Sequence, residues 1–120
     1  MKRTRGQVEA EISKAVVKFE RDYMGRGPTD TKTYLLRDMV IVRLKGILTP
    51  AEHQLVKVEG VELLKQVRTK LLETGRQRLE KGVQEITGLP VVSMHSDLSA
   101  KTGERIIVFV LSESVEERLA

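Results

Sequence analysis

Apolar residues recur every three or four positions over residues 8–23, which is the spacing of one face of an α-helix. They are Val8, Ile12, Ala15, Val16, Phe19 and Tyr23. Thr4 and Gln7 have the spacing of a capping box at the start of this helix, and the glycines of residues 25–28 stop it. The pattern predicts an amphipathic helix followed by a turn.

Two short stretches, residues 31–36 and 39–45, are rich in β-branched and aromatic residues and are separated by Arg37 and Asp38. This spacing predicts a β-hairpin with a two-residue turn, although the turn lacks the usual Asn-Gly or Asp-Gly pair. Alternation divides the second stretch into an apolar and a mixed face, as in an antiparallel sheet with one buried side. The apolar face is Val40, Val42 and Leu44, and the mixed face is Ile41, Arg43 and Lys45.

The strongest local signal is a helix start at Thr49, with Pro50 at the first helical position and Glu52 at the third. A helical pattern of apolar residues then continues to Gly88. One helix over residues 50–87 would be about 57 Å long, whereas a compact domain of this size is only about 35 Å across. We therefore predict a break at Gly60 and a second helix over residues 61–87.

Gly75 and Gly82 lie two turns apart inside that second helix. Each glycine costs about 1 kcal/mol relative to alanine in a helix interior. Either another backbone approaches closely on that side, or the helix is locally weak.

The last part of the chain predicts a second hairpin, with strands over residues 90–96 and 105–111. The second of these strands is apolar on both faces, which indicates a central strand covered on both sides. Ser114 and Glu117 have the spacing to cap a final turn over residues 115–119.

The order helix, hairpin, helix, hairpin predicts one α+β domain over residues 1–120. In this two-layer domain a four-stranded antiparallel sheet packs against two long helices. If the helices cover one side of the sheet, its opposite face is free for a partner.

The composition of the chain excludes several classes of protein. The chain has 120 residues, no Cys, and 21 basic against 17 acidic residues, for a net charge of +4. Without Cys there is no disulfide framework, thiol nucleophile or Cys-based metal site. The chain has no apolar run of about 18 residues, and no apolar segment follows its first five residues. We expect a small soluble cytoplasmic protein without a membrane span.

The sequence contains no group of residues at the spacing of a known catalytic or cofactor-binding motif. The sequence has no Gly-x-Gly-x-x-Gly or Walker motif, and His53 is not part of a paired-histidine metal motif. Ser93 and His95 are two apart on a strand, too far for dependable contact as a nucleophile and its base. We predict no enzyme, no cofactor and no metal site.

The best group of polar residues is expected on the sheet. His95 shares its strand face with Asp97, and Arg43 shares one with Lys45, so the four could form a mixed patch. Such a patch could bind an anion, sense pH through His95 or contact an acidic partner, or it could be an ordinary solvated sheet face. Arg26, in the glycine loop of residues 25–28, is a further candidate for binding an anion, although that loop also serves simply to leave the helix.

Several segments, in this order, resemble the MpsC-like family of bacterial proteins over residues 5–112. They are residues 25–28, 38–46, 48–52 and 95–97, with residues 86–88 before the last hairpin and 108–111 closing it. The family's name implies association with a sodium-translocating, membrane-potential-generating system. The resemblance implies a soluble accessory protein of cation or bicarbonate transport, at the inner face of the cell membrane, whose partners are a membrane subunit and a large soluble subunit. It brings no catalytic residues.

Three hypotheses follow. The first is a non-enzymatic interaction protein, a homodimer, that acts beside a transport system. The second is a basic nucleic-acid-binding domain, which the isoelectric point near 9.5 leaves open and the scarcity of aromatic residues disfavours. The third is an enzyme or anion sensor that uses His95 with Arg43.

Overall fold

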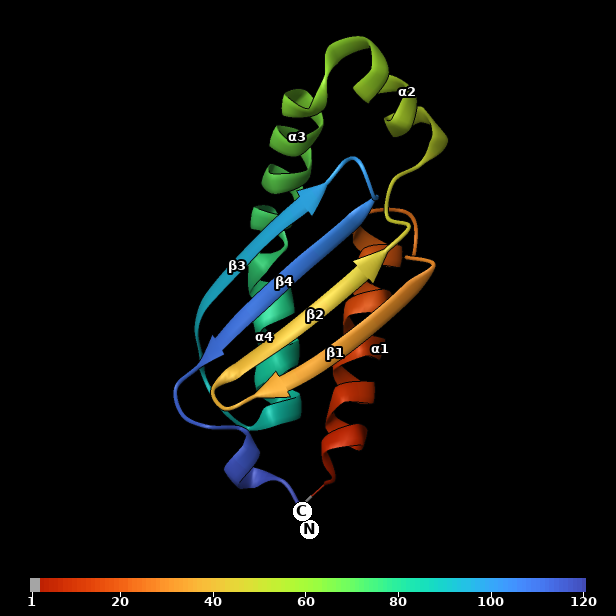
Figure 1. Ribbon diagram of the computed structural model, residues 1–120. Coiled ribbons are helices and arrows are strands. Elements are labelled where there is room, and N and C mark those ends of the chain that lie inside the picture. The colour runs from red at the N-terminus through yellow and green to blue at the C-terminus, as the bar shows by residue number, and fades with distance from the viewer. Residues whose placement is uncertain (1–2) are drawn as a thin grey trace.

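The computed structural model describes residues 3–120; Met1 and Lys2, with which the predicted domain begins, lie outside the described residues. The order of helices and hairpins is the predicted one (Figure 1). The elements are α1 (Arg5–Tyr23), β1 (Asp30–Leu36), β2 (Met39–Lys45), α2 (Pro50–Glu59), α3 (Val61–Thr74), α4 (Arg76–Thr87), β3 (Val91–Ser99), β4 (Glu104–Leu111) and a final 3₁₀ turn, Glu116–Arg118. The strands form one antiparallel sheet in the order β1-β2-β4-β3, which confirms the α+β fold.

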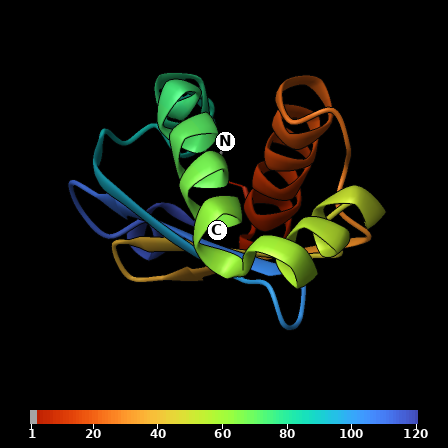
Figure 2. The same ribbon diagram turned by 90° about the horizontal axis from the view of Figure 1, so that it is seen from above.

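All helices that contact the sheet lie on one side of it. Figure 2 shows α1 and the helices α3 and α4 above the sheet, and no helix below it among residues 3–120. The buried core lies between these two layers. Its members include Ile12, Val16 and Phe19 from α1, Val40, Val42 and Leu44 from β2, Leu79 and Val83 from α4, and Ile107 and Phe109 from β4.

Local signals in the sequence set the helix starts and the first turn. Thr4 and Gln7 form the predicted capping box of α1, and Thr49 and Glu52 form that of α2. The β1–β2 hairpin has the predicted two-residue turn. Arg37 takes a φ of 55° there, in the region that Gly or Asn usually occupies.

The long helical segment extends beyond the sheet. It breaks at Gly60, as predicted, where φ is 83°. The molecule measures 51 × 24 × 22 Å, and α2 with the first turns of α3 forms one end of it (Figure 1). The molecule is therefore elongated despite the break at Gly60, which turns α2 back beside α3.

The prediction of one helix over residues 61–87 is wrong, because the helix also breaks at Gly75. A Cβ atom on Gly75 would lie 2.5 Å from Cζ of the Phe19 ring on α1. The close neighbour is thus an aromatic ring and not another backbone. A Cβ atom on Gly82 would meet nothing within 4 Å outside the backbone of its own helix. No neighbouring side chain therefore requires glycine at this position.

Gly75→Ala is therefore expected to destabilise the fold, whereas Gly82→Ala should stabilise it. Phe19 is buried and cannot swing away, so the added methyl group should cost about 1–3 kcal/mol through overpacking. At position 82 the methyl group meets no such neighbour, and alanine should gain about 0.5–1 kcal/mol in the helix. Urea unfolding of both variants measures the two signs, and equal signs would contradict this account of Gly75.

Two further predictions need correction. β4 is central, but only one of its faces is covered: Arg105, Ile107, Phe109 and Leu111 are buried, and the residues between them are partly exposed. The final turn has no side-chain cap from Ser114. Val115 instead is buried and donates its N–H to the Arg37 carbonyl, which anchors the turn on the first hairpin.

Candidate functional site

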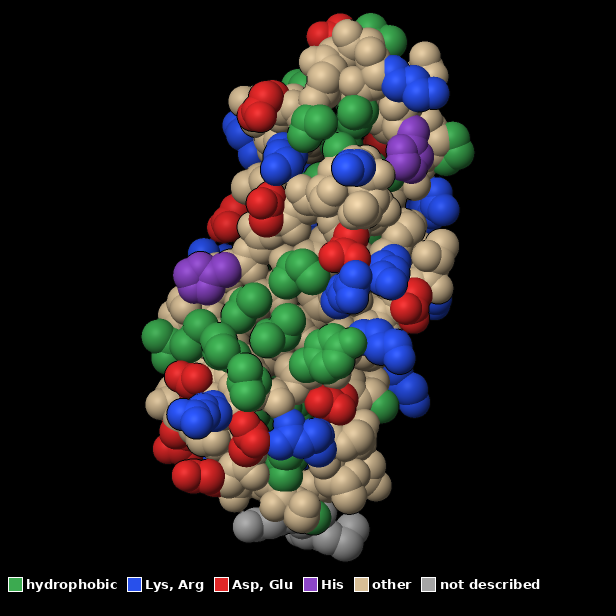
Figure 3. Space-filling view, viewed as in Figure 1, with side chains coloured by type: hydrophobic (Ala, Val, Ile, Leu, Met, Phe, Trp, Pro, Cys, Tyr) green, Lys and Arg blue, Asp and Glu red, His purple; other side chains and the backbone are tan. Residues whose placement is uncertain are grey.

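The most unusual surface of the molecule is the uncovered face of the sheet, which we call the open sheet face. Figure 3 looks onto it and shows hydrophobic side chains gathered over its middle and lower part. The register and the burial pattern place on it Tyr34 and Leu36 of β1, Met39 and Ile41 of β2, and Ile106, Val108 and Val110 of β4. Tyr34 is 47% and Leu36 is 49% exposed. An apolar sheet face of this kind marks an interaction surface.

The structure brings four of the five candidate residues onto this face. Arg43 and Asp97 both pair with Ile106, from opposite sides, so one strand separates them. His95 pairs with Val108, and Lys45 lies at the end of β2. They therefore border the apolar residues and do not converge on one point.

Charges on the open sheet face are divided between its two sides. Arg43 forms an ion pair with Glu104 at 2.8 Å, and this hydrogen bond together with the charge of Glu104 raises the pKa of Arg43. Lys32 and Lys45 have no ion-pair partner among residues 3–120. The basic residues Lys32, Arg43 and Lys45 lie on the β1–β2 side, and the acidic residues Asp97 and Glu104 lie on the β3–β4 side.

The polar contact of His95 is local, whereas Asp97 also forms an ion pair with Lys65 of α3. His95 Nε2 lies 3.1 Å from Ser93 Oγ, so the expectation that these two side chains do not meet is wrong. This pair is exposed, and the hydrogen bonds of residues 3–120 include no third group that orients the imidazole, as a nucleophile–base pair needs. The backbone N–H of Leu98, at 2.8 Å, and the ammonium of Lys65, at 3.3 Å, hold the pKa of Asp97 below its usual range.

Arg26 lies apart from the other four candidates. Its Nη1 donates a hydrogen bond of 3.2 Å to the carbonyl of Leu48, in the segment between β2 and α2. The guanidinium therefore ties the loop of residues 25–28 to that segment.

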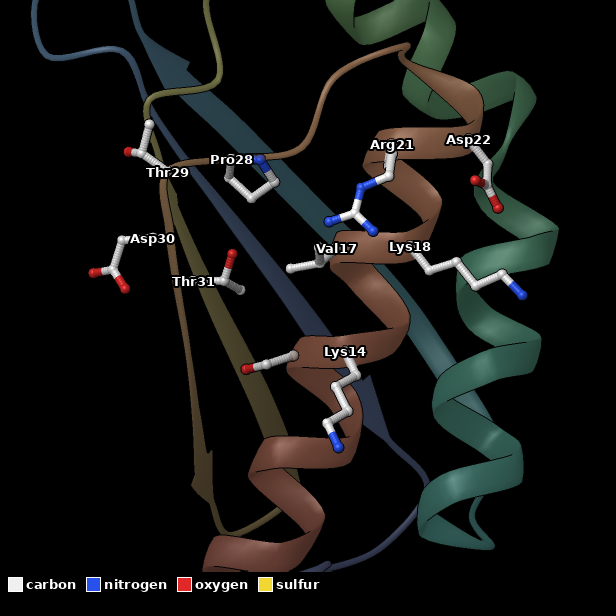
Figure 4. Close-up of a pocket in the computed structure, with 10 residues that line it drawn as sticks. Lys14, Val17, Lys18, Arg21, Asp22, Pro28, Thr29, Asp30 and Thr31 are labelled. Atoms are coloured by element: carbon white, nitrogen blue, oxygen red, sulfur yellow. The ribbon is translucent and has the colours of Figure 1, made fainter.

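A hollow of about 680 Å³ lies between α1 and β1, next to the same loop (Figure 4). Arg21 points across it toward Pro28, and Val17 forms part of its floor. Lys14 and Lys18, which also border it, point in different directions in Figure 4. Because the cations do not converge, the hollow is not a formed anion site.

A second exposed apolar surface runs along α3 and consists of Leu63, Val67 and Leu71, which we call the α3 stripe. Within residues 3–120 no helix is long and apolar enough to cross a bilayer. In the same part of the chain, no three His, Asp or Glu side chains are grouped as metal ligands would be.

The fold and the open sheet face define a class: a two-layer α+β domain that presents a bare, apolar sheet surface with charged borders. The sequence profile described as "Na+-translocating membrane potential-generating system (MpsC)" matches residues 4–113. The chain therefore belongs to the MpsC family.

Two proteins of Bacillus subtilis (strain 168) are similar to this chain. Uncharacterized protein YbcI is 48% identical over 120 residues, which cover 99% of this chain and 97% of YbcI. Uncharacterized protein YrhF is 24% identical over 110 residues, which cover 90% of each chain. No solved structure matches.

Proposed function

We propose that this protein is a non-enzymatic component of a Na⁺-translocating, membrane-potential-generating system, and that it works by binding other proteins through the open sheet face. It acts in the cytoplasm at the inner face of the membrane, beside the membrane subunit and the large soluble subunit of that system. Membership of the MpsC family supports the choice of system.

The observation that carries the proposed mode of action is the uncovered apolar face of the sheet. β4 is central and apolar on both sides, yet one side has no cover among residues 3–120. Burying such a face against a partner gains roughly 25 cal/mol for each Å² of apolar area removed from water. Nucleic-acid binding fits this face less well, because Tyr34 is its single aromatic residue and single-strand readers stack bases on several.

Co-purification tests this function. A tagged full-length chain is recovered from native bacterial cells in mild detergent, and the membrane subunit of the transport system is measured in the eluate. We expect the wild-type chain to retain that subunit and Ile41→Glu, which places a charge in the middle of the apolar face, to retain at least about tenfold less.

Val58→Glu is the matched control. Val58 is 69% exposed on α2, away from the sheet, so the same kind of change should leave recovery unaltered. Absence of the membrane subunit from the wild-type eluate, or equal recovery with Ile41→Glu, would contradict the proposed function.

A further inference from the structure

We infer that the occupant of the open sheet face is a second copy of this chain, packed face to face about a two-fold axis that runs along the strands. The inference rests on the proposed function and extends it: the second copy covers the open sheet face when the membrane subunit does not occupy it. Three observations carry it: the division of charge across the face, the register of the strands and the area available.

The open sheet face is positive along one side and negative along the other. Lys32 and Lys45 lie on the β1–β2 side without an ion-pair partner among residues 3–120. Asp97 and Glu104, whose partners within the chain are Lys65 and Arg43, lie on the β3–β4 side. Asp30, at the start of β1, is an acidic residue on the positive side. A surface divided in this way is complementary to itself when the second copy exchanges the two sides.

A two-fold axis parallel to the strands makes that exchange. It places β1 over β3 of the second copy, and β2 over β4, while each row of paired residues keeps its level along the strands. Lys32 and Asp97 belong to one row, because both are linked through Arg43 and Ile106. In the dimer Lys32 of each copy therefore faces Asp97 of the other.

The same operation brings the apolar rows together. Ile41 pairs with Val108 in one chain, and Met39 pairs with Val110. In the dimer Ile41 of one copy therefore faces Val108 of the other, and Met39 faces Val110. Continuing the register places Lys45 over Glu104. The middle of the interface is then apolar, and Lys32 and Lys45 meet opposite charges at its border, as in specific interfaces.

An axis across the strands fails these tests. It would place β1 over β1 with the order of residues reversed, so that Lys32 would lie over the apolar end near Leu36. It would also leave the β1–β2 side facing the β1–β2 side, so that no lysine of that side would meet Asp97 or Glu104. Only the axis along the strands pairs unlike charges.

The area predicts a reversible dimer. Four strands and seven residues span about 19 by 23 Å, or about 440 Å² of projected area on each copy. About 900 Å² in total lies at the small end of specific interfaces, where contacts are transient. We therefore expect dissociation in the micromolar range.

The first test is the mass of the purified full chain by sedimentation equilibrium over a range of concentrations. We expect the wild type and Val58→Glu to dimerise alike, and Ile41→Glu to dimerise at least about 100-fold more weakly, because two carboxylates would enter the apolar middle. Circular dichroism and urea unfolding verify that Ile41→Glu is folded. A wild-type monomer at hundreds of micromolar, or a dimer that Ile41→Glu leaves intact, such as one formed by the α3 stripe, would overturn the inference.

The second test addresses the axis. Lys32→Asp and Asp97→Lys should each weaken the dimer about tenfold, since both contacts of the two-fold become like-charged. A mixture of the two variants should form a heterodimer of wild-type strength, because every contact between them is again between opposite charges. If the mixture dimerises no better than either variant alone, the proposed axis is wrong.

The two proposals fail separately. A wild-type monomer that still retains the membrane subunit, and loses it on Ile41→Glu, would overturn the second copy and support the proposed function. A dimer with the predicted charge behaviour that retains no membrane subunit would support the second copy and overturn the proposed function.

Discussion

Removing either partner of the buried pair Glu20–Arg105 is expected to lower the unfolding free energy by about 3–5 kcal/mol, whereas removing both should cost little. The two side chains are 1% and 2% exposed, and Arg105 Nη1 lies 3.6 Å from Glu20 Oε1, beyond a good hydrogen bond. Glu20 Oε1 and Arg105 Nε and Nη1 have no hydrogen-bond partner among the described residues. The pair is thus buried at full desolvation cost and incompletely satisfied.

The two single variants should differ in their dependence on pH. Burial raises the pKa of Glu20, although the charges of Arg105 and Arg68 lower it. In Arg105→Met the lone carboxyl can take up a proton, and the folded state then binds that proton more tightly than the unfolded state. Its unfolding free energy should therefore rise as the pH falls. In Glu20→Leu the guanidinium keeps its charge, so the unfolding free energy of this variant should not rise as the pH falls.

Urea unfolding of the wild type, both single variants and the double variant Glu20→Leu/Arg105→Met measures this cycle. At about pH 8 both singles should be strongly destabilised, and at about pH 5 only Arg105→Met should recover in part. The double variant should match or exceed the wild type at both pH values. Additive losses in the double variant would show that the two charges act independently, and would contradict this account of the pair.

Alternation and capping made most of the fold predictable because both depend on residues close in the chain. The inward parity of Val40, Val42 and Leu44 and the cap at Thr49 hold in the structure. The same parity also places Arg105 inward with Ile107 and Phe109, and Glu20 lies one turn from Val16 on the buried face of α1. The pattern therefore predicts that Glu20 and Arg105 are both buried, but it does not predict that their side chains meet.

What the sequence could not predict depends on contacts between distant segments. The need for glycine at position 75 comes from the ring of Phe19, which no local rule connects with it. Parity placed Arg43 with Lys45 and His95 with Asp97. That the two pairs share one face, with Ile106 between Arg43 and Asp97, required the strand order. Apolar residues on both faces of β4 indicated burial on both sides, but within one chain one side remains open; the proposed second copy would cover it.

Arg68→Met is expected to release α2 and to lower the unfolding free energy by about 1.5–3 kcal/mol, because the carboxylate of Glu52 is 22% exposed and keeps part of its hydration. No residue of α2 is buried. The helix is held by Arg68 of α3, whose Nε and Nη2 donate hydrogen bonds of 2.7 and 2.6 Å to the carboxylate of Glu52. Nη2 also donates to the carbonyl of Ile47 at 2.9 Å, so one guanidinium fixes both α2 and the segment before it.

Hydrogen exchange and unfolding at two pH values measure this release. Exchange over residues 50–59 should increase in Arg68→Met while the sheet stays protected. Burial raises the pKa of Glu52, but the hydrogen bonds from Arg68 and from the N–H of Thr49 outweigh it and leave that pKa below its usual value. This stability is present above the ordinary pKa of Glu52 and is lost as the pH falls through the lowered one, so the difference from the wild type should shrink below about pH 4.

Arg76→Met is the matched control for Arg68→Met. Arg76 pairs with Glu73 and Glu80 on the helix surface, where such pairs contribute at most about 1 kcal/mol. Its loss should leave exchange in α2 unaltered. Equal protection of residues 50–59 in the wild type and Arg68→Met would mean that α2 is held by its contacts with α3 and not by the guanidinium of Arg68.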